Sequence, residues 1–494
     1  MWFLRLFVFG TGAAVMAVEF GAERLMEPFF GSSQLVWASL IGLILLALAI
    51  GYEVGGRLAD RWPRPATLGW VTLGSGVFVA LLPLGAEPIL RAMVGGLLGT
   101  PAGVVLAALF GTALLFMPPV AALGVASPFA IRLAAAGDET SGRRAGSLYA
   151  FSTLGSLLGT FLPAFWTIPS FGVRATFWLA AALLILLGLA MARQWRLGFL
   201  LLLPALMPFV ASPLLKPVPG LIGEWETPYQ FAQVYRLPGG DTALSVNDAA
   251  GIQSVYTKAR LTGLYYDAYL VLPFLFPPRQ TVSTLLIGMA AGTIPTMLHR
   301  DVAPYRRLDV TGVEIDPELV ALGRRYFHLT PGAATVVSDD GRVYLEKTQA
   351  RYRLMIVDAY SQEIYIPFYL TTREFFALCR QHLAPGGVLA LNVNAVSSHA
   401  ALLLAIERTA LRVFPHVYVA RAPGLYNRLI VASMEPVALP QATALPSYLR
   451  GVARGLGATW GAPHPGPGLV LTDNLAPVEK LTDQMILERL GQIL

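Results

Sequence analysis

The sequence predicts a multi-span α-helical membrane domain, then a small β-sheet element and an α/β doubly wound domain. The first observation is composition. Of the 494 residues, 55% are hydrophobic and only 13% are charged, about half the charged fraction of an average soluble protein. The other two observations are long apolar segments before residue 216 and alternating short strands and helices after residue 280. We place the domains at residues 1–222, 223–280 and 281–494.

Charge is distributed unevenly along the chain. Residues 1–223 hold 13 Lys and Arg against 8 Asp and Glu, whereas residues 224–494 hold 23 against 22. The second half therefore lacks the excess of basic residues that marks a nucleic-acid binder, and we expect no nucleic-acid partner. The single cysteine, Cys379, excludes an internal disulfide bond, and six scattered histidines make a metal site unexpected.

Seven segments of the first half are apolar and long enough to cross a lipid bilayer, which takes about 20 residues per helix. They are too many and too long for a signal peptide, so the bilayer is an expected partner. Acids at membrane depth are costly and often functional. Glu19, Glu23 and Glu53 therefore leave a transport path open beside the simpler interpretation of a helical anchor. The segments lie near residues 3–23, 33–54, 66–85, 102–123, 147–168, 174–192 and 197–215.

The second half begins with two short aromatic and β-branched runs separated by PGGD, which predict the small sheet. From residue 281 on, buried strands such as TVSTLLIG and RYRLMIVDAY alternate with helices such as PELVALGRRYF. Parallel strands with crossover helices indicate a Rossmann-like, methyltransferase-type sheet. Ligands of such sheets bind at the carboxyl ends of the strands. Those ends carry Gly288, Glu314, Asp339, Asp340 and Asp358.

The acidic strand ends indicate a nucleoside site. A carboxylate at Glu314 can accept both ribose hydroxyls of an adenosine, although capping of the Glu-Ile-Asp-Pro turn is the simpler role. The turn Asp339-Asp340-Gly341 can bind the adenine amino group or serve only as a capped turn. Burial raises the pKa of an acid such as Asp358 unless it meets a cation, and a polyamine would supply that cation.

The order and spacing of these motifs resemble those of the polyamine aminopropyltransferases, the spermidine synthase family, and more closely its bacterial membrane-fused branch. The resemblance covers residues 224–435. ETPYQ, GIQ and LYYDAYL resemble the family's first motifs, GVEIDPELV its ribose-binding strand and SDDGRVYL its adenine-side turn. VDAYSQEIYIPFYLTTREFF resembles the segment that begins with the proposed base. GLYNRLIVAS contains the late tyrosine, and LTDNLAPVE (471–479) is similar to the tail of the fused branch.

The resemblance implies transfer of an aminopropyl group from decarboxylated S-adenosylmethionine to a polyamine such as putrescine. Methylthioadenosine would be released, and no further cofactor is expected. Asp358 would be the catalytic base that takes a proton from the acceptor amine. The resemblance also implies a multi-pass protein of the bacterial inner membrane and a possible homodimer. The implied substrate-binding residues are Gln230, Gln253, Tyr265, Tyr266, Asp267, Gly288, Glu314, Ile315, Asp339, Asp340, Gly341, Tyr360 and Tyr426.

Two amine-binding acids of the family are missing from this sequence. The acid that grips the amine of the co-substrate falls at Ala291, and the second acid after the base falls at Ser361. The amine-binding parts of the site therefore differ from those of the family. Aromatic faces can hold a cation by cation–π contact, so aromatic residues are among the candidate substitutes. The candidate substitutes are Asp267, Asp339, Glu363, Tyr265, Tyr266 and Tyr360.

Two other functions stay open. An S-adenosylmethionine-dependent methyltransferase would use the same fold and Glu314, and the missing acid at Ala291 weakens selection against that parent compound. A non-catalytic polyamine or nucleoside sensor coupled to the membrane domain would bind without turnover. The retained strand-end residues argue against a degenerate scaffold.

The loop charges conflict with the expected location of the catalytic domain. Loops 57–64, 132–144 and 193–196 are cationic, and the positive-inside rule puts them in the cytoplasm. Seven spans would then place residues 224–494 outside, whereas a nucleoside-using enzyme is expected in the cytoplasm. The segment near 197–215 contains three prolines and is the first candidate for a segment that does not span.

Overall fold

The computed structural model describes residues 1–31, 34–97, 101–134, 141–210, 214–247, 251–361 and 364–490. The chain groups into two compact units, which we treat separately. The first contains Met1–Pro217 and Glu224–Phe231, and the second contains Val218–Gly223 and Ala232–Leu494. The predicted boundary at residues 222 and 223 is therefore close to the observed one. The stretch Glu224–Phe231, however, groups with the helices.

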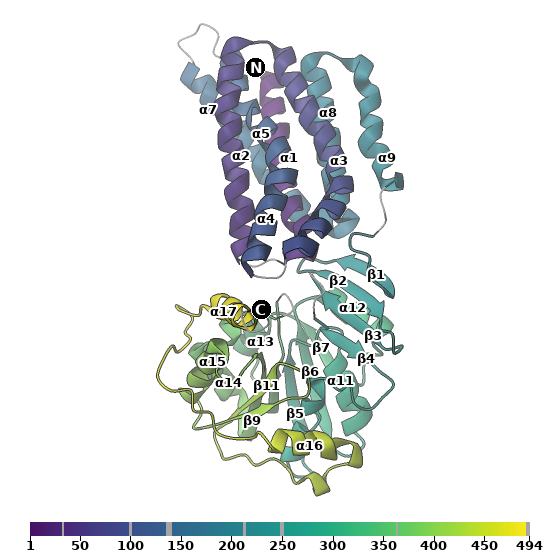
Figure 1. The fold of residues 1–494 in the computed structure, drawn as a ribbon, viewed down its shortest axis with the longest axis vertical. Helices are drawn as coiled ribbons and strands as arrows, with labels where there is room; N and C mark the ends of the chain where they lie inside the picture. Colours follow the sequence, from purple (N-terminus) through teal and green to yellow (C-terminus); the bar gives the residue numbers. More distant parts are fainter. Residues whose placement is uncertain are drawn as a thin grey trace. The chain divides into compact units, whose positions relative to one another are not determined.

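The first unit is built from helices (Figure 1). Five of the described helical stretches are long and strongly apolar, as expected of membrane spans. Helix α1 packs against both α7 and α8, α3 packs along α8, and α2 runs beside α4, α5 and α6. The elements are α1 (Trp2–Phe30), α2 (Gln34–Arg61), α3 (Pro65–Leu97), α4 (Pro101–Leu115), α5 (Met117–Gly124), α6 (Ala126–Ala134), α7 (Ser141–Leu162), η1 (Pro163–Thr167), α8 (Ile168–Ala192), η2 (Trp195–Leu201) and α9 (Leu202–Val210).

Five helical stretches of the described chain are long and apolar enough to cross a membrane, against seven predicted segments, and the number of spans stays a prediction. Two predicted segments fall in one stretch, Gly142–Ala192, whose 51 residues are enough for two crossings. Its backbone is non-helical at Gly172, which separates α8 into two parts. The predicted segment near 102–123 is replaced by Met117–Ala134, and the last predicted segment holds only a shorter helix, Trp195–Val210.

Glycines bring α1 and α7 into backbone contact. A Cβ atom at Gly155 would lie 1.9 Å from the carbonyl oxygen of Phe9, and one at Gly159 would lie 2.1 Å from that of Ala13. On the other helix, a Cβ at Gly12 would lie 2.4 Å from the carbonyl oxygen of Ser152. Small residues allow such close approach between membrane helices, whose association depends on packing.

A small antiparallel sheet precedes the larger one, as predicted. Its strands follow the order of the chain, and the PGGD segment turns between β2 and β3, where Gly240 has a φ of 89°. The strands are β1 (Leu221–Glu226), β2 (Phe231–Arg236), β3 (Thr242–Val246) and β4 (Ser254–Tyr256). A short helix, α10 (Tyr266–Tyr269), and the turn η3 (Leu272–Leu275) lead into the second sheet.

The seven-stranded sheet of the second unit has the order β10-β11-β9-β8-β5-β6-β7. The five strands from β7 to β9 are parallel, and β11 lies antiparallel between β9 and β10. Within this sheet the chain enters at β5, continues outward through β6 and β7, and then returns to β8 on the other side of β5. The strand order therefore reverses between the two central strands β5 and β8. Open α/β sheets bind ligands at this kind of reversal. The strands are β5 (Val282–Ile287), β6 (Leu308–Glu314), β7 (Thr335–Ser338), β8 (Tyr352–Val357), β9 (Leu383–Asn394), β10 (His416–Arg421) and β11 (Asn427–Ser433).

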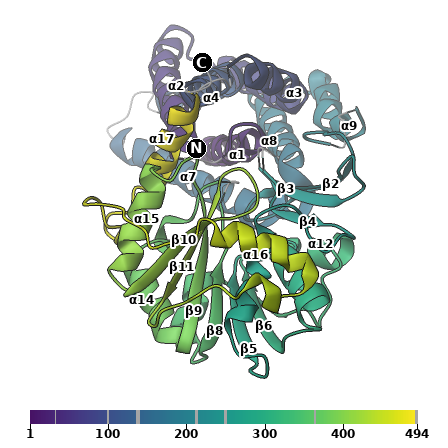
Figure 2. The same cartoon turned by 60° about the horizontal axis from the view of Figure 1, so that its bottom comes forward.

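Helices cover both faces of this sheet (Figure 2). Alternate residues of each strand face opposite sides, so Leu286 packs with α11 and α16 while Leu285 and Ile287 pack with α14 and α15. This double layer confirms the predicted fold class. The helices are α11 (Thr293–Met297), η4 (Leu298–Val302), α12 (Pro317–Tyr326), α13 (Gly341–Lys347), η5 (Phe368–Leu370), α14 (Arg373–His382), α15 (Ala401–Leu411), η6 (Ala442–Ala444), η7 (Ser447–Leu449), α16 (Arg450–Gly457) and α17 (Val478–Leu490).

The contact between α1 and α7 yields a prediction. Gly155→Ala should destabilise the first unit by about 1–3 kcal/mol, the usual cost of overpacking, because the new methyl group collides with the Phe9 carbonyl. Thermal unfolding in detergent measures the effect. Gly146→Ala is the matched control, because a Cβ there, also on α7, meets nothing within 4 Å. Equal unfolding temperatures for both variants would contradict the backbone contact.

Candidate active site at the reversal of the sheet

Gly288 stands at the centre of the site, directly after β5. Its φ is 78°, a conformation that favours glycine. A Cβ at Gly288 would lie 2.7 Å from the carbonyl oxygen of Asp358, and the Asp358 N–H donates to the carbonyl of Ile287 at 2.9 Å. The ends of β5 and β8 therefore meet without room for a side chain, and Gly288 and Asp358 are neighbours.

Glu314 ends β6 and holds the loop that follows β5. Its Oε2 accepts hydrogen bonds from the backbone N–H groups of Met289 at 3.0 Å and Ala290 at 2.7 Å. Its Oε1 accepts from the N–H of Asp316 at 3.1 Å. Burial raises the pKa of Glu314, while these three hydrogen bonds lower it. Two backbone N–H groups of this loop are therefore hydrogen-bonded to a carboxylate of the protein itself.

Asp358, directly after β8, is only partly buried and has two side-chain partners. Tyr265 donates its hydroxyl to Oδ2 at 3.1 Å, and Asn392 donates its amide to Oδ1 at 3.1 Å. Burial raises the pKa of Asp358 to about 7, although contacts with Asn392, Tyr265 and Tyr269 favour the carboxylate. A group with this pKa exchanges a proton near neutral pH, as a general base must.

Aromatic side chains surround Asp358. The rings of Tyr265 and Tyr266 lie 4.2 Å apart, and the Tyr266 hydroxyl donates to the carbonyl of Ile252 at 3.0 Å. Tyr360 donates its hydroxyl to the carbonyl of Asn392 at 2.9 Å. Burial raises the pKa of each of these tyrosines, so their hydroxyls stay protonated. They can offer ring faces and hydroxyl groups, but no negative charge, to a cationic ligand.

The predicted adenine-side turn lies between β7 and α13. Asp340 caps α13, since its Oδ1 accepts from the N–H groups of Arg342 and Val343 at 2.8 and 3.0 Å. Asp339 pairs with Lys347 at 2.9 Å. A Cβ at Gly341 would lie 2.2 Å from Ile287 Cγ2, so the turn fits tightly against β5.

Other predicted residues lie near the strand ends of the second unit. Ile315 follows Glu314 and is 39% exposed, which leaves an apolar surface beside the loop after β5. Tyr426 precedes β11, and its carbonyl accepts from the N–H of Ala395 at 2.7 Å. A Cβ at the neighbouring Gly424 would lie 3.9 Å from the backbone nitrogen of Tyr265. Gln253 lies between β3 and β4, where its N–H donates to Leu244 at 2.8 Å.

The contacts of Asp267 do not support the predicted role of amine anchor. Its carboxylate is buried and accepts hydrogen bonds from Thr262 N–H at 2.9 Å, Thr262 Oγ1 at 2.8 Å and Gly263 N–H at 2.9 Å. Both oxygens of the Asp267 carboxylate are therefore bonded to the loop before α10, and these bonds fix the shape of that loop. Gln230 belongs to the stretch that groups with the first unit, and its contact with a nucleoside stays a prediction.

The positions of the missing acids have local explanations. Ala291 is fully buried, and its N–H donates to Ser254 Oγ at 3.0 Å, so its side chain packs inside the protein. Ser361 is exposed and pairs with Tyr365 through reciprocal backbone hydrogen bonds of 2.8 and 3.2 Å. Glu363, a candidate substitute, lies outside the described residues.

Sequence reasoning missed a row of asparagines beside Asp358. Asn427 donates its amide to the side-chain oxygens of Asn392 at 3.1 Å and Asn394 at 2.9 Å, and Asn392 donates to Asp358. Asn392 and Asn394 lie at the carboxyl end of β9, next to β8. The strand-end rule applied to GGVLALNVN would have found them. The position of Asn427 next to Asn394 depends on the antiparallel pairing of β11 with β9, and the sequence patterns do not predict this pairing.

The sheet order, the glycine turn after β5 and the acidic end of β6 define a methyltransferase-type α/β fold, with the carboxylate of Asp358 beside the turn. Within that class, residues 292–438 match the spermine/spermidine synthase domain. The second unit is therefore similar to the polyamine aminopropyltransferase (spermidine synthase) family over these residues.

Two relatives show how far the similarity extends. A probable polyamine aminopropyl transferase of Bifidobacterium longum is 36% identical over 235 residues, 45% of this chain and 51% of that protein. The polyamine aminopropyltransferase of Vibrio vulnificus is 31% identical over 205 residues, 41% of this chain and 62% of that protein. The chain therefore spans between half and two thirds of the length of these relatives.

Among solved structures, a probable spermidine synthase from Corynebacterium glutamicum is 22% identical, with a TM-score of 0.39. The match covers 51% of this chain and 98% of that one. The fold assignment rests on the strand order and pairing of the second unit.

The meeting of β5 and β8 yields a second prediction. Gly288→Ala should destabilise the second unit by about 1–3 kcal/mol and displace Asp358, because a left-handed φ and a close approach coincide at this residue. Gly240→Ala separates the two causes, since Gly240 has a φ of 89° but open space around it. Thermal unfolding of the full chain is the measurement. A loss no larger than that of the control would contradict the close approach.

Proposed function

We propose that the second unit transfers the aminopropyl group of decarboxylated S-adenosylmethionine to a polyamine such as putrescine, with release of methylthioadenosine. The observation that carries the proposal is Asp358, a partly buried carboxylate with a pKa of about 7 at the reversal of the sheet. The similarity of residues 292–438 to the spermine/spermidine synthase domain supports the reaction class. The identities of the acceptor and the co-substrate rest on the resemblance.

The proposed step is an in-line displacement. Free amines have pKa values near 10, so Asp358 first accepts a proton from the acceptor ammonium. The neutral nitrogen then attacks the aminopropyl carbon next to the sulfonium. The carbon–sulfur bond breaks, its electron pair returns to sulfur, and methylthioadenosine leaves as a neutral thioether. Tyr265 and Asn392 orient the carboxylate for this transfer.

The nucleoside would occupy the strand ends on the β6 side of Asp358. Its ribose would meet Glu314, its adenine would lie between Ile315 and the turn at Asp339–Gly341, and its sulfonium would approach the tyrosines around Asp358. The three N–H bonds to Glu314 fix the orientation of its carboxylate before a ligand arrives. This preorganisation reduces the ordering cost of binding.

A methyltransferase is the second candidate, favoured by one observation. The loop after β5 has a buried alanine where the family carries the amine-gripping acid. Mass spectrometry distinguishes the candidates when detergent-solubilised protein receives putrescine with either the decarboxylated or the parent co-substrate. Methylthioadenosine and spermidine from the first mixture alone support the proposal. S-adenosylhomocysteine from the second alone supports methyl transfer, and nucleoside binding without product supports a sensor.

The role of Asp358 yields a third prediction. Asp358→Asn should lower kcat by about 10²–10⁴-fold, the usual contribution of a general base, while methylthioadenosine still binds. In the native protein kcat/KM should rise with pH through about 7, because the carboxylate is the active form. Steady-state kinetics and calorimetric binding measure these effects. Retained turnover in the variant would exclude Asp358 as the base.

The same pKa predicts an effect on stability. Folding raises the pKa of Asp358 above its ordinary value, so the folded state binds more protons than the unfolded state between pH 4 and about 7. The stability contribution of this group is present at low pH and is lost as the pH rises through about 7. Asp358→Asn should therefore gain stability relative to the native protein at pH 8.

We further propose that the second unit faces the cytoplasm, because the charged sulfonium co-substrate cannot cross a bilayer unaided. Contacts within the first unit identify the end of its helices at which the chain leaves it. Arg132 pairs with Asp60 at the end of α2, the end of the unit that also carries the N-terminus of α1. Lys216 instead contacts Pro28 and Phe29 at the C-terminal end of α1. The chain thus leaves the first unit at the end opposite these cationic residues.

The side assignment yields a fourth prediction. Reporter fusions after Leu494 should show a cytoplasmic C-terminus, which would make this protein an exception to the positive-inside rule. A fusion within loop 57–64 is the internal control, because it should report the opposite side. An external C-terminus would contradict the proposed side and would remove the cytoplasmic co-substrate from the proposed reaction.

A further inference from the structure

The C-terminal motif LTDNLAPVE (471–479) has no part in the function proposed so far. In the structure, Leu471 donates its N–H to Thr409 Oγ1 at 2.9 Å and accepts from the N–H of Arg373 at 2.9 Å. A reciprocal backbone pair between Thr472 and Leu475 then turns the chain at Asp473. The motif thus lies against the start of α14.

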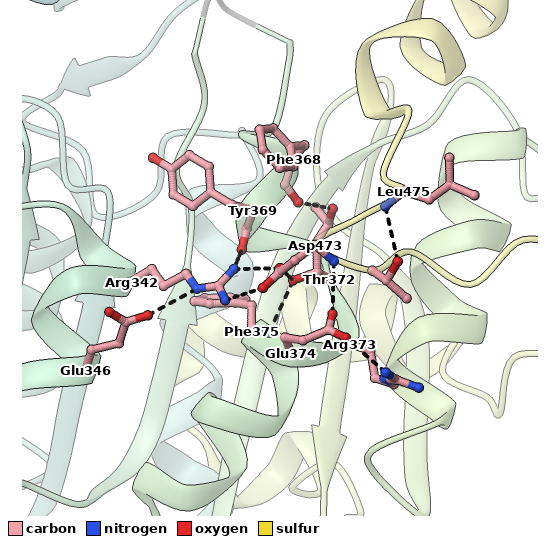
Figure 3. A network of polar contacts seen from close by, with 12 residues as sticks. Arg342, Glu346, Phe368, Tyr369, Thr372, Arg373, Glu374, Phe375, Asp473 and Leu475 are labelled. Atoms are coloured by element: carbon pink, nitrogen blue, oxygen red, sulfur yellow. Dashed lines mark hydrogen bonds and ion pairs between the residues drawn. The ribbon is translucent and has the colours of Figure 1, made fainter.

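Asp473 is the most connected residue of this motif (Figure 3). Its two oxygens accept from Arg342 Nη1 at 2.8 Å and Nη2 at 2.6 Å, which makes a two-pronged ion pair. The Thr372 hydroxyl donates to Oδ1 at 2.7 Å, and the Asp473 N–H donates to Glu374 at 3.1 Å. A single side chain therefore joins the first turn of α13 to the N-cap of α14.

Hydrogen bonds connect Arg342 to Tyr369 and both residues to Asp340 in the predicted adenine-side turn. Arg342 donates its backbone N–H to Asp340 at 2.8 Å and its Nη1 to the Tyr369 carbonyl at 3.1 Å. Tyr369 in turn donates its hydroxyl to Asp340 Oδ2 at 2.7 Å. Asp340 belongs to the turn and Arg342 to the first turn of α13 directly after it, whereas Tyr369 and Asp473 contact these residues from other segments.

Geometry marks the pair with Asp473 as the stronger one at Arg342. The Arg342 side chain is 19% exposed and that of Asp473 is 42% exposed, but two parallel N–H···O bonds to a carboxylate are directional and strong. The other acidic partner, Glu346, is 56% exposed and lies 3.5 Å away. Exposed pairs of that kind contribute little. The guanidinium accordingly holds the pKa of Asp473 below its usual range.

We propose that Asp473 is a positioning residue for the adenine side of the nucleoside site, acting through Arg342 and Tyr369 on the turn at Asp339–Gly341. The proposal rests on the proposed function, because it assigns that turn to the nucleobase. It gives the LTDNLAPVE motif a role in binding the adenosyl co-substrate and no role in the acceptor half of the site.

The test compares Asp473→Asn with Glu346→Gln in the full-length, detergent-solubilised protein. Asp473→Asn should weaken methylthioadenosine binding about tenfold, as expected for loss of one charged hydrogen bond. KM for the adenosyl co-substrate should rise more than kcat falls, and KM for the amine should not change. Glu346→Gln removes the exposed partner of the same arginine and should leave all three values unchanged.

Hydrogen exchange supplies a readout that needs no nucleoside. Residues 339–347 and 368–375 should exchange faster in Asp473→Asn than in Glu346→Gln. Tyr369→Phe, which removes only the hydroxyl bond to Asp340, should weaken nucleoside binding in the same direction and serves if Asp473→Asn does not fold. Faster exchange with native affinity would overturn the positioning role. Absence of nucleoside binding by the native protein would instead overturn the proposed function and, with it, this role.

Discussion

The three hydrogen bonds that Glu314 accepts hold the candidate site together. A buried carboxylate needs hydrogen-bond partners, and Glu314 finds two of its three in the loop after β5. That loop contains no charged side chain, so its shape depends on the strand next to it. Gly288 can turn sharply beside Asp358 because the following residues are fixed on Glu314. Asp358, the proposed base, and Glu314, the proposed ribose-binding carboxylate, are in this way connected through the loop after β5.

The site divides into a conventional half and an altered half. On the nucleoside side, the strand ends carry the acids that the motifs predict, and the structure brings Gly288, Glu314 and Asp358 together at the reversal of the sheet. On the amine side, Ala291 is packed away and Asp267 is occupied with its own loop. Tyrosine rings and asparagine amides remain around Asp358. An amine bound there would meet neutral dipoles and ring faces beside the carboxylate of Asp358.

The sequence predicted the parallel part of the sheet well because its signals are local. Each strand from β5 to β9 is a short apolar run, and each ends in a glycine, an acid or an amide that the topology gathers at one edge. The antiparallel strand β11 and its Asn427 escaped prediction because pairing with β9 is a long-range choice. The ion pair between Arg342 and Asp473 escaped for the same reason, since 131 residues separate the partners. The predicted segments near 102–123 and 197–215 differ from the helices found, because apolar length alone does not show where a helix begins and ends.

The grouping of Glu224–Phe231 with the helices has a consequence for anyone who wishes to study the soluble half alone. Glu226 accepts a hydrogen bond from the N–H of Val173 at 2.8 Å, directly after the break at Gly172, and Arg24 donates to the carbonyl of Pro228 at 2.6 Å. Phe231 is buried in the same cluster of apolar residues as Phe177. A fragment cut at residue 223 would expose this phenylalanine and leave Glu226 without its helix partner. Lipids or detergents that loosen the helices would likewise disturb the stretch that carries Gln230, so solubilising conditions are themselves an experimental variable for this chain.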